Sequence, residues 1–138
     1  MNNRTNIKNV ISWLLRITAS IILLQTLYFK FTGHRESIDL FTKLGVEPWG
    51  RIGTGIIEFI ACLLLLFPST IFMGALLTIG LMFGAIVSHL TVLGIESKGD
   101  GGQLFILAII VLLCSFILLV LHKKQGITLF RKFIKQNQ

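Results

Sequence analysis

Residues 51–93 read RIGTGIIEFIACLLLLFPSTIFMGALLTIGLMFGAIVSHLTVL, two long apolar runs joined by the turn Phe67-Pro68-Ser69-Thr70. A helix needs roughly 20 apolar residues to cross the hydrocarbon core of a membrane. The first run, from about Arg51 to Phe67, is short by that measure, and Trp49 and Gly50 extend it to the interface. The turn is so tight that the two runs must form an antiparallel helical hairpin.

Two further apolar segments flank this hairpin, and the whole chain is apolar in composition. Of its 138 residues, 54% are hydrophobic and only 14% are charged, and the mean hydropathy is +0.82. Lipid requires each spanning segment to satisfy its own backbone, which favours helices over strands. We therefore predict an all-α integral membrane protein, a single four-helix transmembrane bundle over residues 1–138. The predicted spans are about 10–31, 51–67, 71–93 and 103–121, followed by a basic tail, 122–138.

The placement of charge predicts the orientation of the bundle. The residues before the first apolar core and those after the last are basic without any acidic residue: Arg4, Lys8, Arg16, Lys123, Lys124, Arg131, Lys132 and Lys135. The opposite loops, which include Lys98, balance basic against acidic residues. Because Lys and Arg favour the cytoplasmic side, we expect both termini in the cytoplasm. The net charge of +7 then indicates anionic lipid as the partner, not nucleic acid.

The N-terminal segment is expected to remain as a helix. Its apolar stretch is longer than that of a cleaved signal peptide, and it contains Gln25 and Lys30 before any plausible cleavage site. Two flanking segments show an interfacial pattern. Apolar residues recur every third position in Glu36–Leu44, which predicts a short helix on the outer surface. The segment Ile127–Ile134 combines apolar and basic residues, which is typical of a helix lying along the inner leaflet.

Polar residues inside the spans are the candidates for function, because they are costly in lipid and usually face the interior of a bundle. They are Gln25, Lys30, Glu58 and His89. By helical rise, Glu58 lies about 10 Å and His89 roughly 6 Å below the outer ends of their helices. All four therefore fall in the outer half of the membrane, and we expect a polar pocket that opens outward.

Helical spacing predicts which side of each span faces the interior. The predicted inner faces are, in chain order, Arg16, Ala19, Leu23, Thr26 and Lys30; Arg51, Gly55, Glu58 and Cys62; Thr78, Met82, Ala85 and His89; and Gln103, Ile110 and Cys114. A ridge of small residues, Gly80, Gly84 and Ser88, is expected to allow close approach of another helix.

The chain resembles the DoxX-like membrane proteins from about Trp13 to Leu121. The resemblance rests on "RITASIILLQTLYFKFTG", which begins at Arg16 and includes Lys30; on "LFTKLGVEPW" in the first loop; on "GTGIIEF" with Glu58; and on "GAIVSHL" with His89. It implies a four-helix protein of the bacterial inner membrane. It also implies a link to redox metabolism, since some relatives belong to quinone-linked sulfur oxidation or oxidative-stress complexes.

Two functions follow from these residues, and the sequence does not decide between them or whether the protein is an enzyme. In the first, Glu58 and His89 form a proton-handling catalytic pair, and Gln25 and Lys30 bind a polar ligand, plausibly a quinone. A redox partner protein and a homo-oligomer are then expected. In the second, the protein is a membrane scaffold or transport-type protein. Glu58 is then neutralised by Lys30 or Arg51, and the polar cluster holds the helices in register.

Other chemistries are less well supported by the residues. A metal site from His34, Glu58 and His89 lacks any ligand-spacing motif, so no metal is expected. Cys62 and Cys114 form no Cys-x-x-Cys pair and lie inside apolar segments. We interpret them as buried thiols that pack as small apolar residues.

Overall fold

The computed structural model describes residues 2–97 and 99–136, so Lys98 and the end of the predicted tail, 137–138, lie outside the described residues. No strand occurs in this described part of the chain. The helices, in order, are α1 (Asn2–Phe31), α2 (Arg35–Lys43), α3 (Trp49–Leu66), α4 (Ile71–Ser88), the π-helical turn η1 (His89–Leu93), α5 (Gln103–Leu121) and α6 (Lys123–Gln136).

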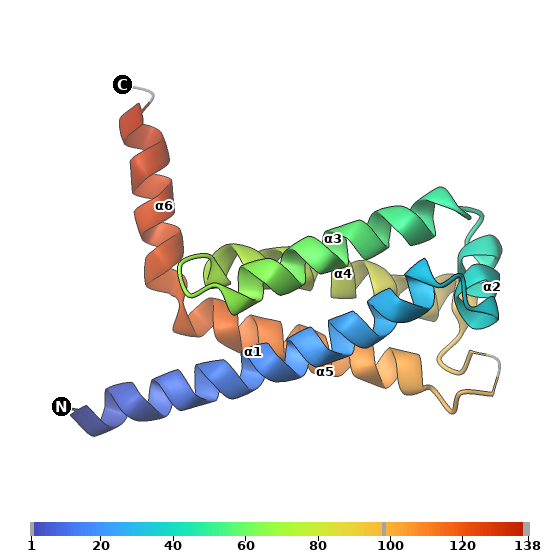
Figure 1. Ribbon diagram of the computed structural model, residues 1–138, viewed down its shortest axis with the longest axis horizontal. Coiled ribbons are helices and arrows are strands. Elements are labelled where there is room, and N and C mark those ends of the chain that lie inside the picture. Colours follow the sequence, from blue (N-terminus) through green and yellow to red (C-terminus); the bar gives the residue numbers. More distant parts are fainter. Residues whose placement is uncertain (1, 98, 137–138) are drawn as a thin grey trace.

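Four of the described helices are long and apolar enough to cross a membrane: α1 from Asn6 onward, α3, α4 continued by η1, and α5. The predicted all-α fold with four spans is thereby confirmed. The first helix begins well before the predicted position 10, because the polar residues ahead of the apolar segment continue the same helix. Both termini lie at one end of the bundle, as an even number of spans requires (Figure 1).

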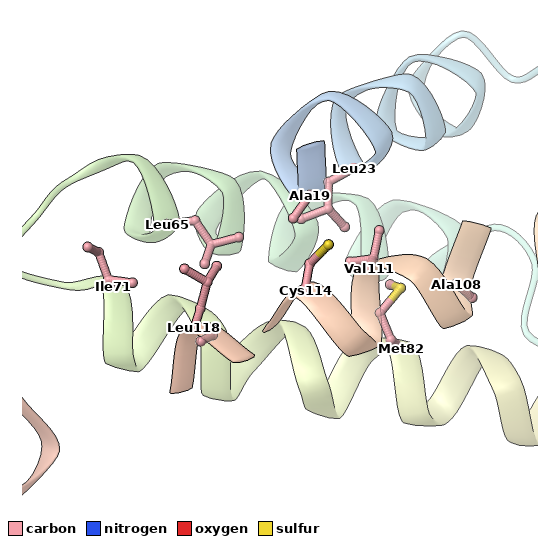
Figure 2. Close-up of a cluster of buried hydrophobic side chains, with 10 residues drawn as sticks. Ala19, Leu23, Leu65, Ile71, Met82, Ala108, Val111, Cys114 and Leu118 are labelled. Carbon is pink, nitrogen blue, oxygen red and sulfur yellow. The ribbon is translucent and has the colours of Figure 1, made fainter. Parts of the chain in front are cut away.

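The four spans form a closed ring in which α1 packs on α3 and α5, and α4 packs on α3 and α5. Small residues at Ala19, Ala75 and Ala108 are buried where the helices meet, which lets their backbones approach closely. Figure 2 shows this core, made of Ala19, Leu23, Leu65, Ile71, Ala75, Met82, Ala108, Val111, Cys114 and Leu118. Large apolar side chains on the outside of the ring, such as Ile21, Phe83 and Phe116, are exposed and are suited to contact with lipid.

The α3–α4 hairpin is as tight as the sequence predicts. A Cβ atom on Gly74 would lie 2.7 Å from the backbone nitrogen of Leu65, so only glycine fits at this crossing. In the turn, the Thr70 hydroxyl donates to the Leu64 carbonyl at 2.9 Å, which gives a partner to one of the last four carbonyls of α3.

The inner faces predicted for α1, α3 and α4 are confirmed, since their members are buried or half-buried. The prediction for α5 was right for Cys114 and wrong for Gln103 and Ile110, which are exposed; the buried face consists of Ala108, Val111, Cys114, Ser115 and Leu118. Almost every residue of α5 is apolar, so polarity did not distinguish its faces.

The ridge of small residues on α4 was also assigned wrongly within this chain. A Cβ atom on Gly80 or Gly84 would meet nothing within 4 Å, and Ser88 is only half-buried. Gly74, which lies on a different face of α4, allows the close approach to α3.

The two flanking segments form helices as predicted. The segment predicted for the outer surface forms α2, which lies across one end of the bundle, and the basic tail forms α6 (Figure 1). Helix α6 leaves the opposite end of the bundle at a steep angle to the spanning helices (Figure 1).

Candidate functional site

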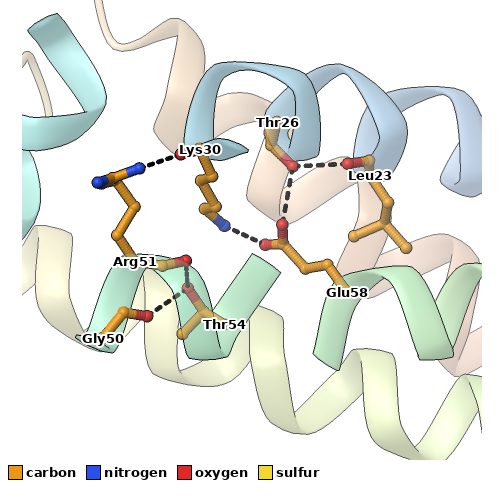
Figure 3. A network of polar contacts seen from close by, with 7 residues as sticks. All are labelled: Leu23, Thr26, Lys30, Gly50, Arg51, Thr54 and Glu58. Atoms are coloured by element: carbon orange, nitrogen blue, oxygen red, sulfur yellow. Dashed lines mark hydrogen bonds and ion pairs between the residues drawn. The ribbon is translucent and has the colours of Figure 1, made fainter. Parts of the chain in front are cut away.

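The centre of the candidate site is an ion pair between α1 and α3. Lys30 Nζ, in the last turn of α1, donates to Glu58 Oε1, and the two side chains are only 14% and 5% exposed. The pair lies between the two helices (Figure 3). The sequence allowed either Lys30 or Arg51 to pair with Glu58, and the structure assigns Lys30. Arg51 pairs instead with Glu47, with 2.7 Å between Nη2 and Oε1.

Thr26 lies beside this pair, one helical turn before Lys30. Its Oγ1 is 3.3 Å from Glu58 Oε2 and 2.9 Å from the Leu23 carbonyl oxygen. A hydroxyl has a single hydrogen, so Thr26 donates to one of these acceptors at a time. Its place on the predicted inner face of α1, four residues from Lys30, was the signal that could have assigned it to the site.

Arg51 holds the backbone at the same end of the bundle. Its Nη1 donates to the carbonyl of Lys30 in the last turn of α1 (Figure 3), which also accepts a long hydrogen bond from the backbone N–H of Gly33 at 3.4 Å. Its Nε donates to Glu47 Oε1 at 2.9 Å. Helix α3 therefore binds Lys30 twice, through Glu58 at the side chain and through Arg51 at the main chain.

Arg16 plays the matching part at the opposite end of the α1–α3 pair. Its Nε and Nη2 donate to the carbonyls of Leu65 and Leu66, the last two residues of α3. The residue is only 2% exposed, and its guanidinium carbon lies 4.1 Å from the centre of the Trp13 ring. A cation at the C-terminal end of a helix is favoured by the helix dipole as well as by these hydrogen bonds. Arg16, which the sequence suggested as an orientation signal, is therefore also a buried helix cap.

The other two predicted site residues do not contact the ion pair. Gln25 is exposed on the outer surface of α1, because it lies one residue, or about 100°, from the inner-face position of Thr26. His89 is buried, and its Nδ1 lies 2.8 Å from the carbonyl oxygen of Gly94. Since a carbonyl only accepts, Nδ1 carries the hydrogen and Nε2 of the neutral ring carries the lone pair.

Helix α2 covers the end of the site that lies away from the chain termini. The ring of Phe41 lies 5.8 Å from Lys30 Nζ. Lys43 Nζ donates to the Leu93 carbonyl at 3.1 Å, so a basic residue again binds the C-terminal end of a neighbouring helix, here η1.

Neither of two grooves in the structure includes the residues of the expected outer pocket. The larger, of about 450 Å³, is an apolar groove on the lipid-facing side of α3 and α4, lined by Ile57, Leu64, Met73, Leu76, Leu77, Gly80 and Leu81. The smaller, of about 140 Å³, lies between α2 and the segment after η1, lined by Asp39, Leu40, Lys43, Leu93, Glu96 and Ser97. The second groove therefore adjoins the end of the helix that carries His89.

Asp100 organises the loop that leads into α5. Its carboxylate accepts from the backbone N–H groups of Ser97 at 2.8 Å, Gly102 at 2.9 Å and Leu104 at 3.2 Å. Burial opposes ionisation of this carboxyl, but the three N–H donors outweigh it and hold the pKa of Asp100 below its ordinary value.

A second polar contact lies at the end of the bundle that carries both termini. Ser12 Oγ and His122 Nε2 are 2.9 Å apart and join α1 to the junction of α5 and α6. Burial, and then the charges of Lys8 and Arg16, lower the pKa of His122. The imidazole is thus held neutral next to two cations.

Metal-ligand residues do not gather in the described structure. Among the residues that it describes, no group of three or more His, Cys, Asp or Glu side chains could hold a metal ion. Cys62 and Cys114 are buried free thiols, and the Sγ of Cys62 lies 4.0 Å from the carbonyl oxygen of Ser20.

Comparison with known proteins gives one family. The model of the DoxX-like family matches residues 14–118, which run from α1 through most of α5 and include Lys30, Glu58 and His89. No curated protein and no solved structure matches the chain.

Proposed function

The chain belongs to the DoxX-like family of membrane proteins, and from that premise we propose that it is a redox-associated membrane subunit that binds a quinone headgroup, or a similar small polar ligand, at the Lys30–Glu58 pair. The observation that supports this proposal is that, within the described part of the chain, Lys30 and Glu58 bind each other and no helix end. Arg16, Lys43 and Arg51 all donate to backbone carbonyls at the ends of neighbouring helices.

The difference between the cations that bind helix ends and Lys30, which binds Glu58, matters because charges inside a membrane are costly and tend to mark functional sites. The burial of Arg16 is explained by carbonyls at the end of α3 that need a donor, and that of Arg51 by its bonds to Glu47 and to the Lys30 carbonyl. Among the described residues, the side-chain hydrogen bonds of the Lys30–Glu58 pair join these two residues and Thr26 alone. A buried ion pair is weak support for stability, because desolvation offsets much of the attraction.

The chemistry of the pair suits a ligand that carries oxygen atoms and exchanges protons. The ammonium group of Lys30 is a donor for a carbonyl or phenolate oxygen, and Glu58 is a proton acceptor when ionised. His89 presents the lone pair of Nε2 and serves in this proposal as a second proton acceptor near the outer end. The headgroup enters beside α2, whose Phe41 lies next to the lysine. A bound quinol is oxidised to the quinone, its two protons pass to Glu58 and His89, and its two electrons pass to a redox partner protein.

The proposal includes an orientation and a location. The end of the bundle with both termini is rich in Lys and Arg, which favours the cytoplasmic side. The Lys30–Glu58 pair then lies in the outer half of a bacterial inner membrane. The exposed apolar surface is compatible with homo-oligomers of the chain.

The test is quinone binding by the purified full chain in lipid nanodiscs. We expect a water-soluble quinone analogue to bind the wild-type protein, and Glu58→Gln and Lys30→Met to weaken binding about tenfold or more, the loss of a charge-assisted hydrogen bond. Glu47→Gln is the matched control, since it removes an outer carboxylate that pairs with Arg51 rather than Lys30. Equal binding by the wild type and Glu58→Gln would refute the assigned site.

A second candidate function is a non-enzymatic scaffold or transport-type protein in which the pair is structural. The completeness of the partners of Glu58, namely Lys30 and Thr26, favours it. It predicts that Lys30→Met and Glu58→Gln each lower the free energy of unfolding, by about 2 kcal/mol, and that the double variant loses little more than either single one. It also predicts no quinone binding by the wild type.

A further inference from the structure

Helix α6 has two chemically different faces. At 100° per residue, one face carries Gly126, Ile127, Phe130 and Ile134, with Lys123 at its start, and the side chains of Lys124, Arg131, Lys132 and Lys135 lie about 100° or more around the helix from Phe130. The large apolar side chains are not covered by the rest of the chain: Ile127 is 51%, Phe130 66% and Ile134 45% exposed.

The first turn of α6 is fixed to the α3–α4 turn by specific contacts. The side chain of Gln125 accepts from the backbone N–H of Phe72 at 3.2 Å and donates to the carbonyl of Pro68 at 2.6 Å. At Gly126 the helix meets the ring of Phe72 so closely that a Cβ atom would lie 2.5 Å from it. These contacts set the angle at which α6 leaves the bundle (Figure 1).

The contact at Gly126 also determines which way the apolar face points. Gly126 lies on the same face as Ile127 and Phe130, and this face meets Phe72 at the start of α4. As α6 continues beyond the bundle, the same face therefore stays directed toward the side on which the spanning helices lie. That side is the hydrocarbon core, and the basic face points away from it.

We propose that α6 is a membrane-surface helix that binds anionic phospholipid at the end of the bundle where both termini lie. Its apolar side chains enter the boundary between headgroups and acyl chains, while Lys124, Arg131 and Lys135 contact the phosphate groups. Firm binding to the membrane interface requires both buried apolar area and electrostatic attraction to anionic lipid. The occupant is a lipid surface rather than a protein because the angle of α6, its apolar face and its basic face all match a plane parallel to the membrane.

A depth measurement on the full chain tests this proposal. A nitroxide label is placed at Phe130→Cys or at Thr128→Cys, on the apolar and polar faces, with Cys62 and Cys114 replaced by alanine. In nanodiscs with about 30% phosphatidylglycerol, we expect the ratio of oxygen to water-soluble nickel accessibility to be about tenfold higher at position 130 than at 128. Equal, water-like accessibility at the two positions overturns the proposal, and leaves the apolar face free for a partner protein.

A composition-matched variant separates helix geometry from charge. The exchange Ile134→Lys with Lys135→Ile keeps the composition and net charge but moves a lysine onto the apolar face. We expect the label at position 130 to lose most of its depth signal, and an unchanged signal contradicts the proposal.

A third experiment tests which class of phospholipid α6 binds. In the variant Lys124→Gln/Arg131→Gln/Lys135→Gln, we expect the depth at position 130 in phosphatidylglycerol nanodiscs to fall to that in phosphatidylcholine. A wild-type helix that is equally deep in both lipids contradicts the assignment to anionic headgroups. None of these measurements depends on the Lys30–Glu58 site.

Discussion

The two ends of the α1–α3 pair use buried cations in different ways. At the end near the chain termini, Arg16 of α1 donates to the last carbonyls of α3. At the other end, Arg51 of α3 donates to a carbonyl in the last turn of α1. The two contacts are reciprocal, and within each helix the arginine and the carbonyl that receives its counterpart lie about four turns apart. Among the residues that the structure describes, ion pairs occur at this second end alone, between Lys30 and Glu58 and between Arg51 and Glu47.

This difference distinguishes charged residues that stabilise the fold from charged residues that are candidates for ligand binding. A guanidinium that serves helix ends needs no ligand to explain its burial, because the carbonyls need a donor. The outer ion pair has no such backbone partner, although the same two helices bear it. We therefore expect variants at the two ends to differ in kind: at Arg16 they affect stability alone, and at Glu58 they affect ligand binding.

The largest effect is expected from Arg16→Met. It leaves the carbonyls of Leu65 and Leu66 without donors in the bundle interior, which should lower the free energy of unfolding by about 3 kcal/mol. Unfolding by sodium dodecyl sulfate in mixed micelles measures it. Arg16→Lys is the control and should lose less, since it keeps a cation at the end of α3. A stability of Arg16→Met equal to that of the wild type would show that the cap contributes nothing.

A smaller loss of stability is expected from Arg51→Met at the outer end. This change removes one carbonyl partner, that of Lys30, together with the pair to Glu47, and both lie nearer to water than Arg16. The same micelle titration should give a decrease below that of Arg16→Met. A larger decrease than at Arg16 would reverse the comparison between the two ends.

Acid should weaken the outer loop through Asp100. Because its pKa in the folded protein is below the ordinary value, ionised Asp100 contributes stability that is present above about pH 4. This stability is lost as the pH falls through the lowered pKa. Unfolding midpoints measured between pH 5 and 2 should converge for the wild type and Asp100→Asn. Parallel curves would contradict this role.

The smallest effect is expected at the opposite end, in milder acid. The folded pKa of His122 is lowered, so the neutral ring contributes stability that is present above about pH 6.5. The unfolded chain binds the proton more readily, and this stability is lost as the pH falls below that value. His122→Gln should flatten the dependence of the unfolding midpoint between pH 7 and 5. If the unfolding midpoint of the variant depends on pH as strongly as that of the wild type, another titratable group causes the loss of stability.

Much of the fold could be predicted from the sequence, because long apolar runs and charge at their ends are direct consequences of the bilayer. Helix ends were least certain, as in α1, where polar residues continue the helix beyond the apolar segment. The inner face of α5 could not be predicted, since a helix that is apolar on all sides offers no contrast.

The candidate site could be predicted in part for a related reason. Lys30 and Glu58 occupy the polar stripes of their helices and do meet. Gln25 was chosen for its polarity, but helical position places it among lipid-facing residues. His89 binds Gly94, which adopts a φ of 88°. Such a loop contact depends on local backbone geometry that helical periodicity does not describe.

The reciprocal arginines have a consequence for how the protein is made. During synthesis α1 emerges before α3, so the guanidinium of Arg16 enters the membrane region while its carbonyl acceptors are still in the ribosome. A lone arginine prefers the headgroup layer, where its side chain reaches water. Helix α1 therefore gains its final depth only when the end of α3 arrives. Insertion of the first span is therefore coupled to that of the second. In a nascent chain stopped before Leu65, the first helix should not yet have reached its final depth in the membrane.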